Sequence, residues 1–464
     1  MRKLLLLMAL AVSIYACTKQ VNPSLNIIET EDNASDLIPV EKALDILNEF
    51  LAKVDMPTKS GKTRTIMSVS TKYVNSARVK SDLDTTEMLA YYIVNFDDNQ
   101  GFAILGAEES LPEIVTVTEN GNFDPATMCV IGIESECEVE DSQEEEMIPP
   151  RYSEEDGDYY CSEMQDVNAF VSELLCAALE LQIDDQVAYV GGCTPWTGGG
   201  GAGSSGGSGS SSGSGSGGSA ALAAVQPMLT YSWGQESPYY KYCYRYPLFS
   251  GPKQALVGCS NVALAMIMAY NEYPTTMVLN GVLLDWSELK MPYFSTFGKE
   301  CAAQLCGGIF NTVPHISGKN YTLVTPTAIR NRMQSFQYSN VNMSRQSGLD
   351  YPLLQSISAM LAGNKPVFIS MMPPSWEGHS WVIDGAQYSP NNSYLLHFNW
   401  GWEGDCNGYF HVNCLNPVAA AFYDEPYNTL NTDPYYDDEY NWHLRVITYD
   451  VPEIPLYCSL QYGY

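Results

Sequence analysis

Apolar positions along the first part of the chain predict a small α+β unit. Over residues 40–54 the apolar side chains recur every three or four positions, which is the spacing of one helix face. Two apolar runs at 89–94 and 102–105 are separated by an Asp-Asp-Asn-Gln-Gly turn, which is typical of a hairpin. The pattern therefore predicts a helix packed against a hairpin within residues 36–124.

A longer block with mixed helix and strand patterns spans residues 225–456. Its clearest helix begins at Cys259 and continues through good helix formers to residue 270. Short apolar strand patterns follow at 379–385 and 395–399. The block is long enough for one sizeable domain, so we expect a second and larger α+β domain.

Two segments of biased composition separate these blocks. Residues 134–158 contain twelve Asp or Glu against the single Arg151, which favours a solvated, mobile segment. Residues 198–219 are all Gly or Ser except Ala202, which is typical of a flexible coil. We therefore expect an acidic spacer over 125–197, followed by a flexible linker over 198–219.

The N-terminal residues are typical of a bacterial export signal. Two basic residues precede an apolar run at 4–12, which is too short to span a bilayer in the mature protein. Cys17 follows a small residue, as in a lipoprotein signal, which divides the start of the chain into a signal peptide over 1–16 and a tether over 17–35. Tyr15 fits that signal imperfectly, so cleavage by an ordinary signal peptidase is the alternative.

The position of Cys17 also predicts where the protein is found. We expect an exported lipoprotein of the outer membrane or cell surface, or a form released outside the cell after processing. Membrane attachment is then through lipid at Cys17 alone.

Composition narrows the classes of partner and cofactor. Lys and Arg number 23 against 54 Asp and Glu, giving a formal net charge of -31, which argues against a nucleic-acid partner because phosphate binding depends on Lys and Arg. The 13 cysteines are scattered singly with no CxxC pair, so no dense disulfide framework is expected. The 5 histidines show no zinc-finger or HExxH spacing, and we expect no metal and no cofactor.

Cys259 is the first candidate for chemistry. It follows Gly258 at the expected start of a helix, where unpaired N–H groups and the macrodipole favour a thiolate. The same N–H groups can hold an oxyanion. An isolated cysteine beside a helix is more often an inert core residue, so a catalytic role depends on a base and on a group that orients the base.

His379 and Asn399 are the candidates for those two roles. His379 heads an apolar strand after a loop, and Asn399 ends the next strand beside several aromatic residues. They follow Cys259 by 120 and 140 residues, near the spacing of papain-like peptidases. His397 is a rival base because it shares a strand face with Asn399, but its place inside an apolar strand favours a structural hydrogen bond.

Together these segments resemble the streptopain family of papain-like cysteine peptidases. The unit at 36–124 is similar to the propeptide and inhibitor domain that accompanies that family. The resemblance implies an α+β fold, with a helical part carrying the cysteine, an antiparallel sheet carrying His and Asn, and a small α+β propeptide domain in front. The motifs are Gly258-Cys259, Gly378-His379-x-Trp381-Val382-Ile383-Asp384-Gly385 and Asn399-Trp400-Gly401-Trp402-x-Gly404.

The resemblance also implies a role for each matching residue. Cys259 is the expected nucleophile and His379 the general base, which later protonates the leaving amine. Asn399 and Trp400 are expected to orient and cover the imidazole. The backbone N–H of Cys259 is expected to contribute to the oxyanion hole.

Four further positions bear on substrate binding. Gly378 is expected beside the bound substrate backbone, and Gln235 is either a turn residue or a donor to the oxyanion. Ser260 and Asn261 stand where smaller apolar residues are expected after the nucleophile. These departures concern substrate preference more than catalysis.

The sequence therefore predicts the exported, lipid-anchored zymogen of a cysteine endopeptidase. Its partners are protein or peptide substrates and its own propeptide in cis. A catalytically silent papain-like binding protein and a peptidase inhibitor acting through residues 36–124 are the alternatives.

Overall fold

The computed structural model describes two folded domains and leaves the connecting segments largely outside the description. Cys17, nearly all of residues 1–35, most of the acidic spacer and the whole Gly/Ser linker lie outside the described residues. The described residues are 19–20, 37–55, 64–75, 87–109, 111–124, 129–130, 191–195, 221–245, 252–318, 321–346, 348–371, 378–412 and 444–462.

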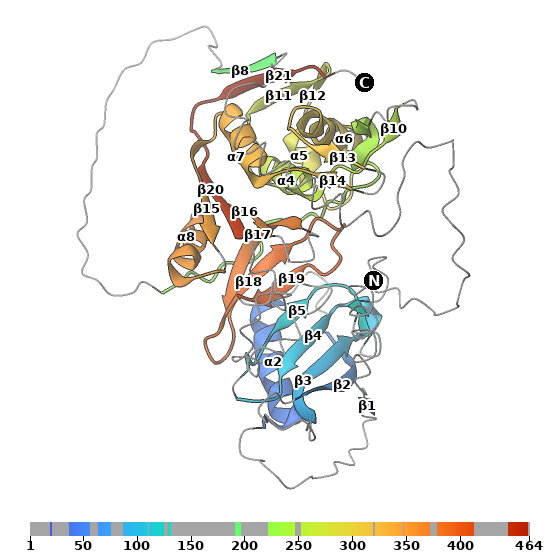
Figure 1. The fold of residues 1–464 in the computed structure, drawn as a ribbon, viewed down its shortest axis with the longest axis vertical. Helices are drawn as coiled ribbons and strands as arrows, with labels where there is room; N and C mark the ends of the chain where they lie inside the picture. Colours follow the sequence, from blue (N-terminus) through green and yellow to red (C-terminus); the bar gives the residue numbers. More distant parts are fainter. Residues whose placement is uncertain are drawn as a thin grey trace, which may run out of the picture.

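The N-terminal domain is one helix packed on an antiparallel sheet (Figure 1). Helix α2 (Val40–Val54) forms as its apolar spacing predicted, and its buried residues, Ala43, Leu47, Phe50 and Leu51, belong to one hydrophobic cluster with the sheet. The predicted hairpin is also confirmed, as β3 (Glu87–Phe96) and β4 (Phe102–Gly106) joined through the short helix η1 (Asp97–Asn99).

Further strands of this domain were not predicted. They are β1 (Lys19–Gln20) and β2 (Ile66–Asn75) on one side of the hairpin, β5 (Thr116–Thr118) on the other, and the separate pair β6 (Phe123–Asp124) and β7 (Cys129–Val130). The β6–β7 pair extends the folded unit a few residues beyond the expected boundary at 124.

The second domain places a group of helices beside an antiparallel sheet. The sheet runs in the order β19 (Gly408–His411), β18 (Tyr394–Asn399), β17 (His379–Tyr388), β16 (Val367–Met371), β20 (Leu444–Asp450) and β15 (Ser339–Gln346). The helices are α4 (Cys259–Asn271), α5 (Trp286–Leu289), α6 (Thr296–Phe310), α7 (Pro326–Ser335) and α8 (Tyr351–Ala362), with the short helix η2 (Tyr239–Tyr242).

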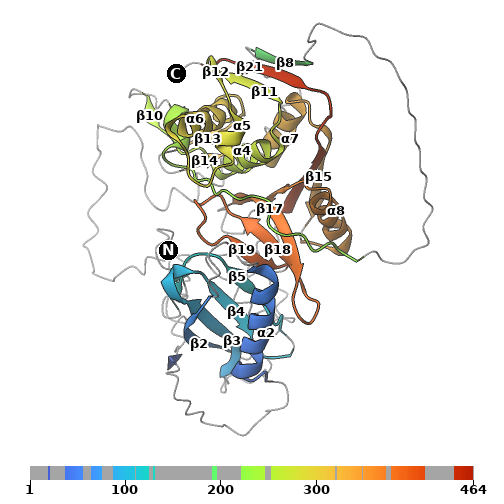
Figure 2. The same cartoon turned by 180° about the vertical axis from the view of Figure 1, so that it is seen from behind.

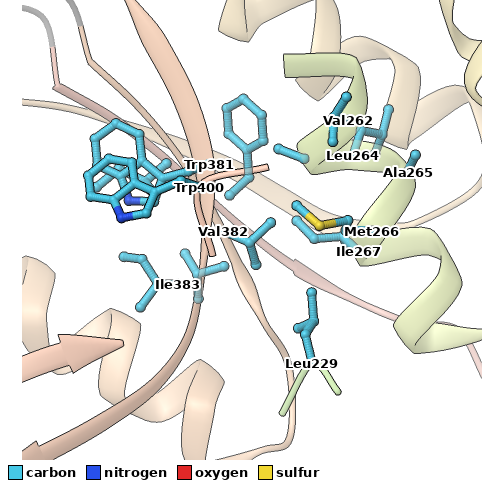
Figure 3. Packing of buried hydrophobic residues seen from close by; sticks show 14 of the residues in the cluster. Leu229, Val262, Leu264, Ala265, Met266, Ile267, Trp381, Val382, Ile383 and Trp400 are labelled. Atoms are coloured by element: carbon cyan, nitrogen blue, oxygen red, sulfur yellow. The ribbon is translucent and has the colours of Figure 1, made fainter. Parts of the chain in front are cut away.

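Helix α4 lies against the middle of this sheet and is almost entirely buried. Figure 3 shows side chains of α4, Val262 and Met266 among them, facing Val382 of β17 across one apolar core. Strand β17 is buried over most of its length because helices and neighbouring strands cover it. The cysteine at the start of α4 and the histidine at the start of β17 are therefore held by rigid elements.

Smaller sheets complete this domain. The pairs β9 (Tyr244–Arg245) with β10 (Lys253–Gln254) and β13 (Ile316–Ser317) with β14 (Thr322–Leu323) flank the helices. A four-stranded sheet joins β12 (Val282–Leu283), β11 (Thr276–Leu279), β21 (Leu456–Leu460) and β8 (Gly191–Pro195). The domain thus extends slightly beyond the expected end at 456.

Strand β8 corrects one expectation about the connecting segment. Residues 191–195 were expected in the acidic spacer over 125–197, but they pair antiparallel with β21 of the second domain. Their own sequence, Gly-Gly-Cys-Thr-Pro, carries no strand pattern, so only the partner strand reveals them. The chain therefore reaches the second domain before the Gly/Ser run begins.

The two domains share a single sheet of 11 strands. Strand β5 pairs antiparallel with β19, with Thr118 opposite Gly408, Val117 opposite Tyr409 and Thr116 opposite Phe410. Figures 1 and 2 show the N-terminal sheet continuing into the sheet of the second domain through this contact. Docking of the N-terminal domain is therefore a matter of backbone hydrogen bonding as well as side-chain packing.

Close packing at Gly408 sets the distance between those two strands. A Cβ at this position would lie 2.3 Å from the carbonyl oxygen of Val117 and 2.6 Å from the Cα of Thr118. Beside it, the hydroxyl of Thr116 donates to the carbonyl of Tyr409 (3.1 Å), and the ring of Phe50 meets the ring of Tyr409 edge to face at 5.5 Å. Strands β5 and β19 are therefore closely packed both at Gly408 and at Tyr409.

Among the described helices, none combines the length and the hydropathy needed to cross a bilayer.

Candidate active site

Glycine at position 258 allows Cys259 to begin a helix at this place. Gly258 has φ 89°, and a Cβ there would lie 2.8 Å from the carbonyl oxygen of Thr322. A residue with a side chain would face both an unfavourable backbone conformation and a clash with backbone. The thiol of Cys259 consequently sits in the first turn of α4, at the positive end of the helix.

Replacing Gly258 with alanine is expected to destabilise the second domain by about 1–3 kcal/mol. Because the strain falls on the residue before the nucleophile, the rate at which iodoacetamide alkylates Cys259 should also fall. Thermal unfolding and mass mapping of the alkylated peptide measure the two effects. An unchanged melting temperature would contradict the requirement for glycine.

Cys259 and His379 form a hydrogen-bonded pair. The thiol is half-buried, and the imidazole belongs to the first residue of β17. Burial by itself would raise the pKa of the Cys259 thiol. The charge and hydrogen bond of His379, together with the backbone N–H groups of Ser380 and Ser260, outweigh burial and hold that pKa below its ordinary value. This is the environment of a reactive thiolate.

The second nitrogen of His379 is held by backbone. Its Nε2 lies 2.9 Å from the carbonyl oxygen of Trp400. Since a carbonyl only accepts, Nε2 carries the proton, and Nδ1 is left to face the thiol. The tautomer of the free imidazole is therefore fixed by Trp400.

This arrangement corrects the prediction for Asn399. Its side chain does not reach the imidazole: Nδ2 donates to the carbonyl of Tyr231 (3.1 Å), and Oδ1 accepts from the N–H of Gly401 (3.3 Å). Asn399 ends β18 as expected, but there its amide is directed along the turn that follows the strand. The backbone of Trp400 supplies the hydrogen bond that was expected from the Asn399 amide.

Aromatic rings enclose the imidazole, as the motif predicted. The ring centroid of Trp402 lies 4.7 Å from that of His379, and those of Trp381 and Trp400 lie at 5.9 and 6.0 Å. Trp381 and Trp400 are buried. These rings exclude water from the His379–Trp400 hydrogen bond, which strengthens it.

Gln235 and Gly378 lie in the immediate surroundings of the pair. The carbonyl of Gln235 accepts the N–H of Val257 (3.1 Å), which places Gln235 beside the turn that carries Cys259. Gly378 directly precedes His379 and is half-buried. Their proposed contacts with substrate stay predictions.

Ser260 and Asn261, which depart from the expected residues after the nucleophile, hold the elements of the site in place. The hydroxyl of Ser260 lies 2.8 Å from that of Ser380, so it joins the helix of Cys259 to the strand of His379. The amide of Asn261 donates to the carbonyl of Val257 (2.8 Å) and holds the preceding turn. Apolar residues could not make these contacts, and no pattern in the sequence signals them.

His397 has a structural role, as its place in an apolar strand suggested. Its Nδ1 lies 2.6 Å from the carboxylate of Asp384, and its Nε2 lies 3.3 Å from the carboxylate of Glu119. Burial alone would lower the pKa of His397, but these two carboxylates raise it to about 10. Glu119 belongs to the N-terminal domain, so the cationic imidazole also links the two domains.

The remaining described free cysteines lack such surroundings. They are Cys243, Cys301, Cys306 and Cys406, all buried, and burial raises the pKa of each thiol. Within the described ranges, no three His, Cys, Asp or Glu side chains come together as metal ligands.

Comparison with known proteins agrees with this geometry. Residues 233–410 match the Peptidase C10 family, and residues 35–131 match the Spi protease inhibitor family. The chain carries a streptopain-family peptidase domain behind a Spi inhibitor-like domain. The predicted fold class, an α+β papain-like domain preceded by a small α+β propeptide domain, is confirmed. At the level of the family, the second domain is a cysteine peptidase domain that follows an inhibitor-like domain.

The matching relatives are distant. The thiol protease/hemagglutinin PrtT of Porphyromonas gingivalis is 24% identical over 209 residues, 38% of this chain and 22% of that protein. Streptopain of Streptococcus pyogenes is 27% identical over 206 residues, 36% of this chain and 48% of that protein. The chain therefore spans less than half the length of these relatives.

Two solved structures from Prevotella intermedia are also similar. A prointerpain A fragment covers 82% of this chain and 100% of its own, at 15% identity and a TM-score of 0.44. The active interpain A cysteine protease covers 48% and 93%, at 20% identity and a TM-score of 0.36.

Proposed function

We propose that this streptopain-family domain is an endopeptidase with Cys259 as nucleophile and His379 as general base and acid. The observation that carries the proposal is the Cys259–His379 hydrogen bond at the start of α4, where the pKa of the thiol is lowered. A thiolate beside a fixed imidazole is the reactive group of acyl transfer.

The geometry supports a two-step hydrolysis. The thiolate of Cys259 forms a bond to the substrate carbonyl carbon, while the N–H of Cys259 and the amide of Gln235 hold the oxyanion. His379 gives its Nδ1 proton to the leaving amine as the C–N bond breaks. It then takes a proton from water, which attacks the acyl carbon and returns the free thiolate and imidazolium. Trp400 holds Nε2 throughout.

The N-terminal domain is proposed to inhibit this site in cis. It continues the sheet through β5, and the amide of Asn120 donates to the carbonyl of Gly404 (3.2 Å), two residues after the Trp402 that packs on His379. The composition of the acidic spacer and of the Gly/Ser linker suits these segments to the activating cleavage. Export and lipid attachment at Cys17 belong to the same proposal and rest on the sequence of residues 1–17.

The chain offers a specific site for testing activation. Arg151 is the only Lys or Arg between Lys80 and Lys241. Trypsin acting there separates the N-terminal domain from the second domain and leaves strand β8 on the second domain, to which it is paired.

Full-length protein is expected to hydrolyse an unfolded protein substrate only weakly, and to gain activity after limited cleavage at Arg151 and inactivation of the trypsin. An epoxysuccinyl inhibitor should then label Cys259, with the Cys259→Ala variant as the unlabelled control. Mass mapping identifies the modified residue. If the cleaved protein stays folded yet neither hydrolyses substrate nor labels at Cys259, the silent binding protein or the inhibitor takes the place of the peptidase.

A further inference from the structure

The Trp400–Gly401 peptide group is hydrogen bonded at both ends. Its carbonyl accepts the Nε2 proton of His379 (2.9 Å), and its N–H donates to Oδ1 of Asn399 (3.3 Å). The preceding N–H, on Trp400 itself, donates to Oδ1 of Asn407 (3.0 Å). The direction of the carbonyl that orients His379 is therefore set by two amide side chains.

Asn407 is well suited to this task because it is itself held firmly. Its side chain is buried, and its Nδ2 donates to the hydroxyl of Ser232 (3.1 Å). Its backbone N–H donates to the carbonyl of Gly404 (3.2 Å), and its carbonyl accepts the N–H of Glu119 (2.7 Å). Oδ1 of Asn407 accepts from the N–H of Trp400, and Nδ2 of Asn407 donates to Ser232. These two contacts allow the side-chain amide of Asn407 only one orientation.

The turn after β18 explains why such support is needed. Gly401 has φ 76°, so the chain reverses sharply directly after Trp400. A backbone carbonyl in a turn changes direction with small rotations of its flanking dihedrals, and an imidazole follows the acceptor that holds it. Anchoring the N–H groups on both sides of the Trp400 carbonyl removes that freedom.

We propose that Asn407 is a positioning residue of the catalytic site, which with Asn399 fixes the Trp400 carbonyl that orients His379. The inference rests on the proposed peptidase function. Asn407 is then a third member of the site, and it acts on His379 through the backbone carbonyl of Trp400. The sequence predicted a direct contact between the imidazole and the side-chain amide of Asn399. Through Ser232, the same residue connects the imidazole to the segment that leads to Gln235.

The test compares Asn407→Leu with Asn407→Asp in the full-length chain. Leucine removes the acceptor for the Trp400 N–H, whereas aspartate keeps an oxygen there and can accept from the Ser232 hydroxyl. After cleavage at Arg151, kcat/KM of Asn407→Leu is expected to fall about 10- to 100-fold, and Asn407→Asp should retain most of the activity. The pH midpoint for alkylation of Cys259 by iodoacetamide should rise in the leucine variant only.

Asn311→Leu is the matched control. The amide of Asn311 donates to the carbonyls of Tyr242 (2.9 Å) and Gly307 (2.8 Å), outside the site. This control should lower the melting temperature without moving the alkylation midpoint. The inference is overturned if Asn407→Leu behaves like the control, or if aspartate and leucine are equally damaging.

Failure of this inference is distinguishable from failure of the proposed function. Alkylation of Cys259 requires no peptide substrate, so its pH profile reports the imidazole–thiol pair even if the wild-type protein hydrolyses nothing. If the pH profile of Cys259 alkylation in Asn407→Leu equals that of the wild type, only the positioning role of Asn407 is contradicted. If the wild-type protein hydrolyses nothing but the alkylation profile of Asn407→Leu is shifted, the proposed peptidase function is contradicted and the positioning role is supported.

Discussion

Replacing His379 with alanine is expected to reduce kcat/KM by at least about a thousandfold. Two effects combine. The leaving amine loses its proton donor, and the Cys259 thiol loses the interaction that outweighs burial. The pKa of the thiol then rises, because desolvation is the largest effect that remains, and the thiolate fraction at neutral pH falls.

The pH dependence of alkylation measures the second effect directly. In the wild type, the midpoint for iodoacetamide modification of Cys259 should lie below that of an ordinary thiol, and in His379→Ala it should lie above the wild-type midpoint. His411→Ala is the control, because burial lowers the pKa of that histidine to about 4 and its strand β19 is separated by β18 from β17, which carries His379. Equal midpoints in His379→Ala and the wild type would contradict the catalytic pair.

Replacing Gly408 with alanine is expected to free the site from the N-terminal domain without cleavage. The added methyl would overlap the carbonyl of Val117 and the Cα of Thr118, which are backbone atoms of β5 and cannot turn away as a side chain can. Overpacking of this kind costs about 1–3 kcal/mol. That cost falls on the docked state, so the activity of the uncleaved chain should rise by about 5- to 150-fold.

The informative quantity is the ratio of activities before and after cleavage at Arg151. Taking this ratio removes any direct effect of the substitution on the nearby Trp400 turn. The ratio should approach one in Gly408→Ala and stay well below one in the wild type and in Gly281→Ala, where a Cβ has no neighbour within 4 Å. A Gly408→Ala ratio equal to that of the wild type would show that the β5–β19 ladder does not carry the inhibition.

The parts of the fold that could be predicted from sequence are those with a local signal. Helix α2 has a regular apolar face, and α4 follows a small-residue turn with a run of good helix formers. The strands carrying His379 and Asn399 are apolar runs bounded by polar loops. Such elements are set by neighbouring residues, so the positions of Cys259 and His379 followed from them.

The parts that could not be predicted depend on contacts between distant segments. Strand β5 has only three residues, and its pairing with β19 joins positions nearly 300 residues apart. The contact between His397 and Glu119 spans 278 residues. The role of the Trp400 carbonyl depends on backbone direction in a turn, which residue identity alone does not reveal, so Asn399 was assigned a contact that the backbone makes.

The shared sheet has a further consequence for the released domains. While the domains are joined, β5 and β19 satisfy each other's backbone groups inside one continuous ladder. Separation converts this ladder into two open edges, one on each product, and an open edge is a template for another extended chain. Gly408 is the first residue of β19, so one end of that open edge carries no side chain. We therefore expect the separated domains to aggregate more readily than the intact chain, and increasingly so as the protein concentration rises.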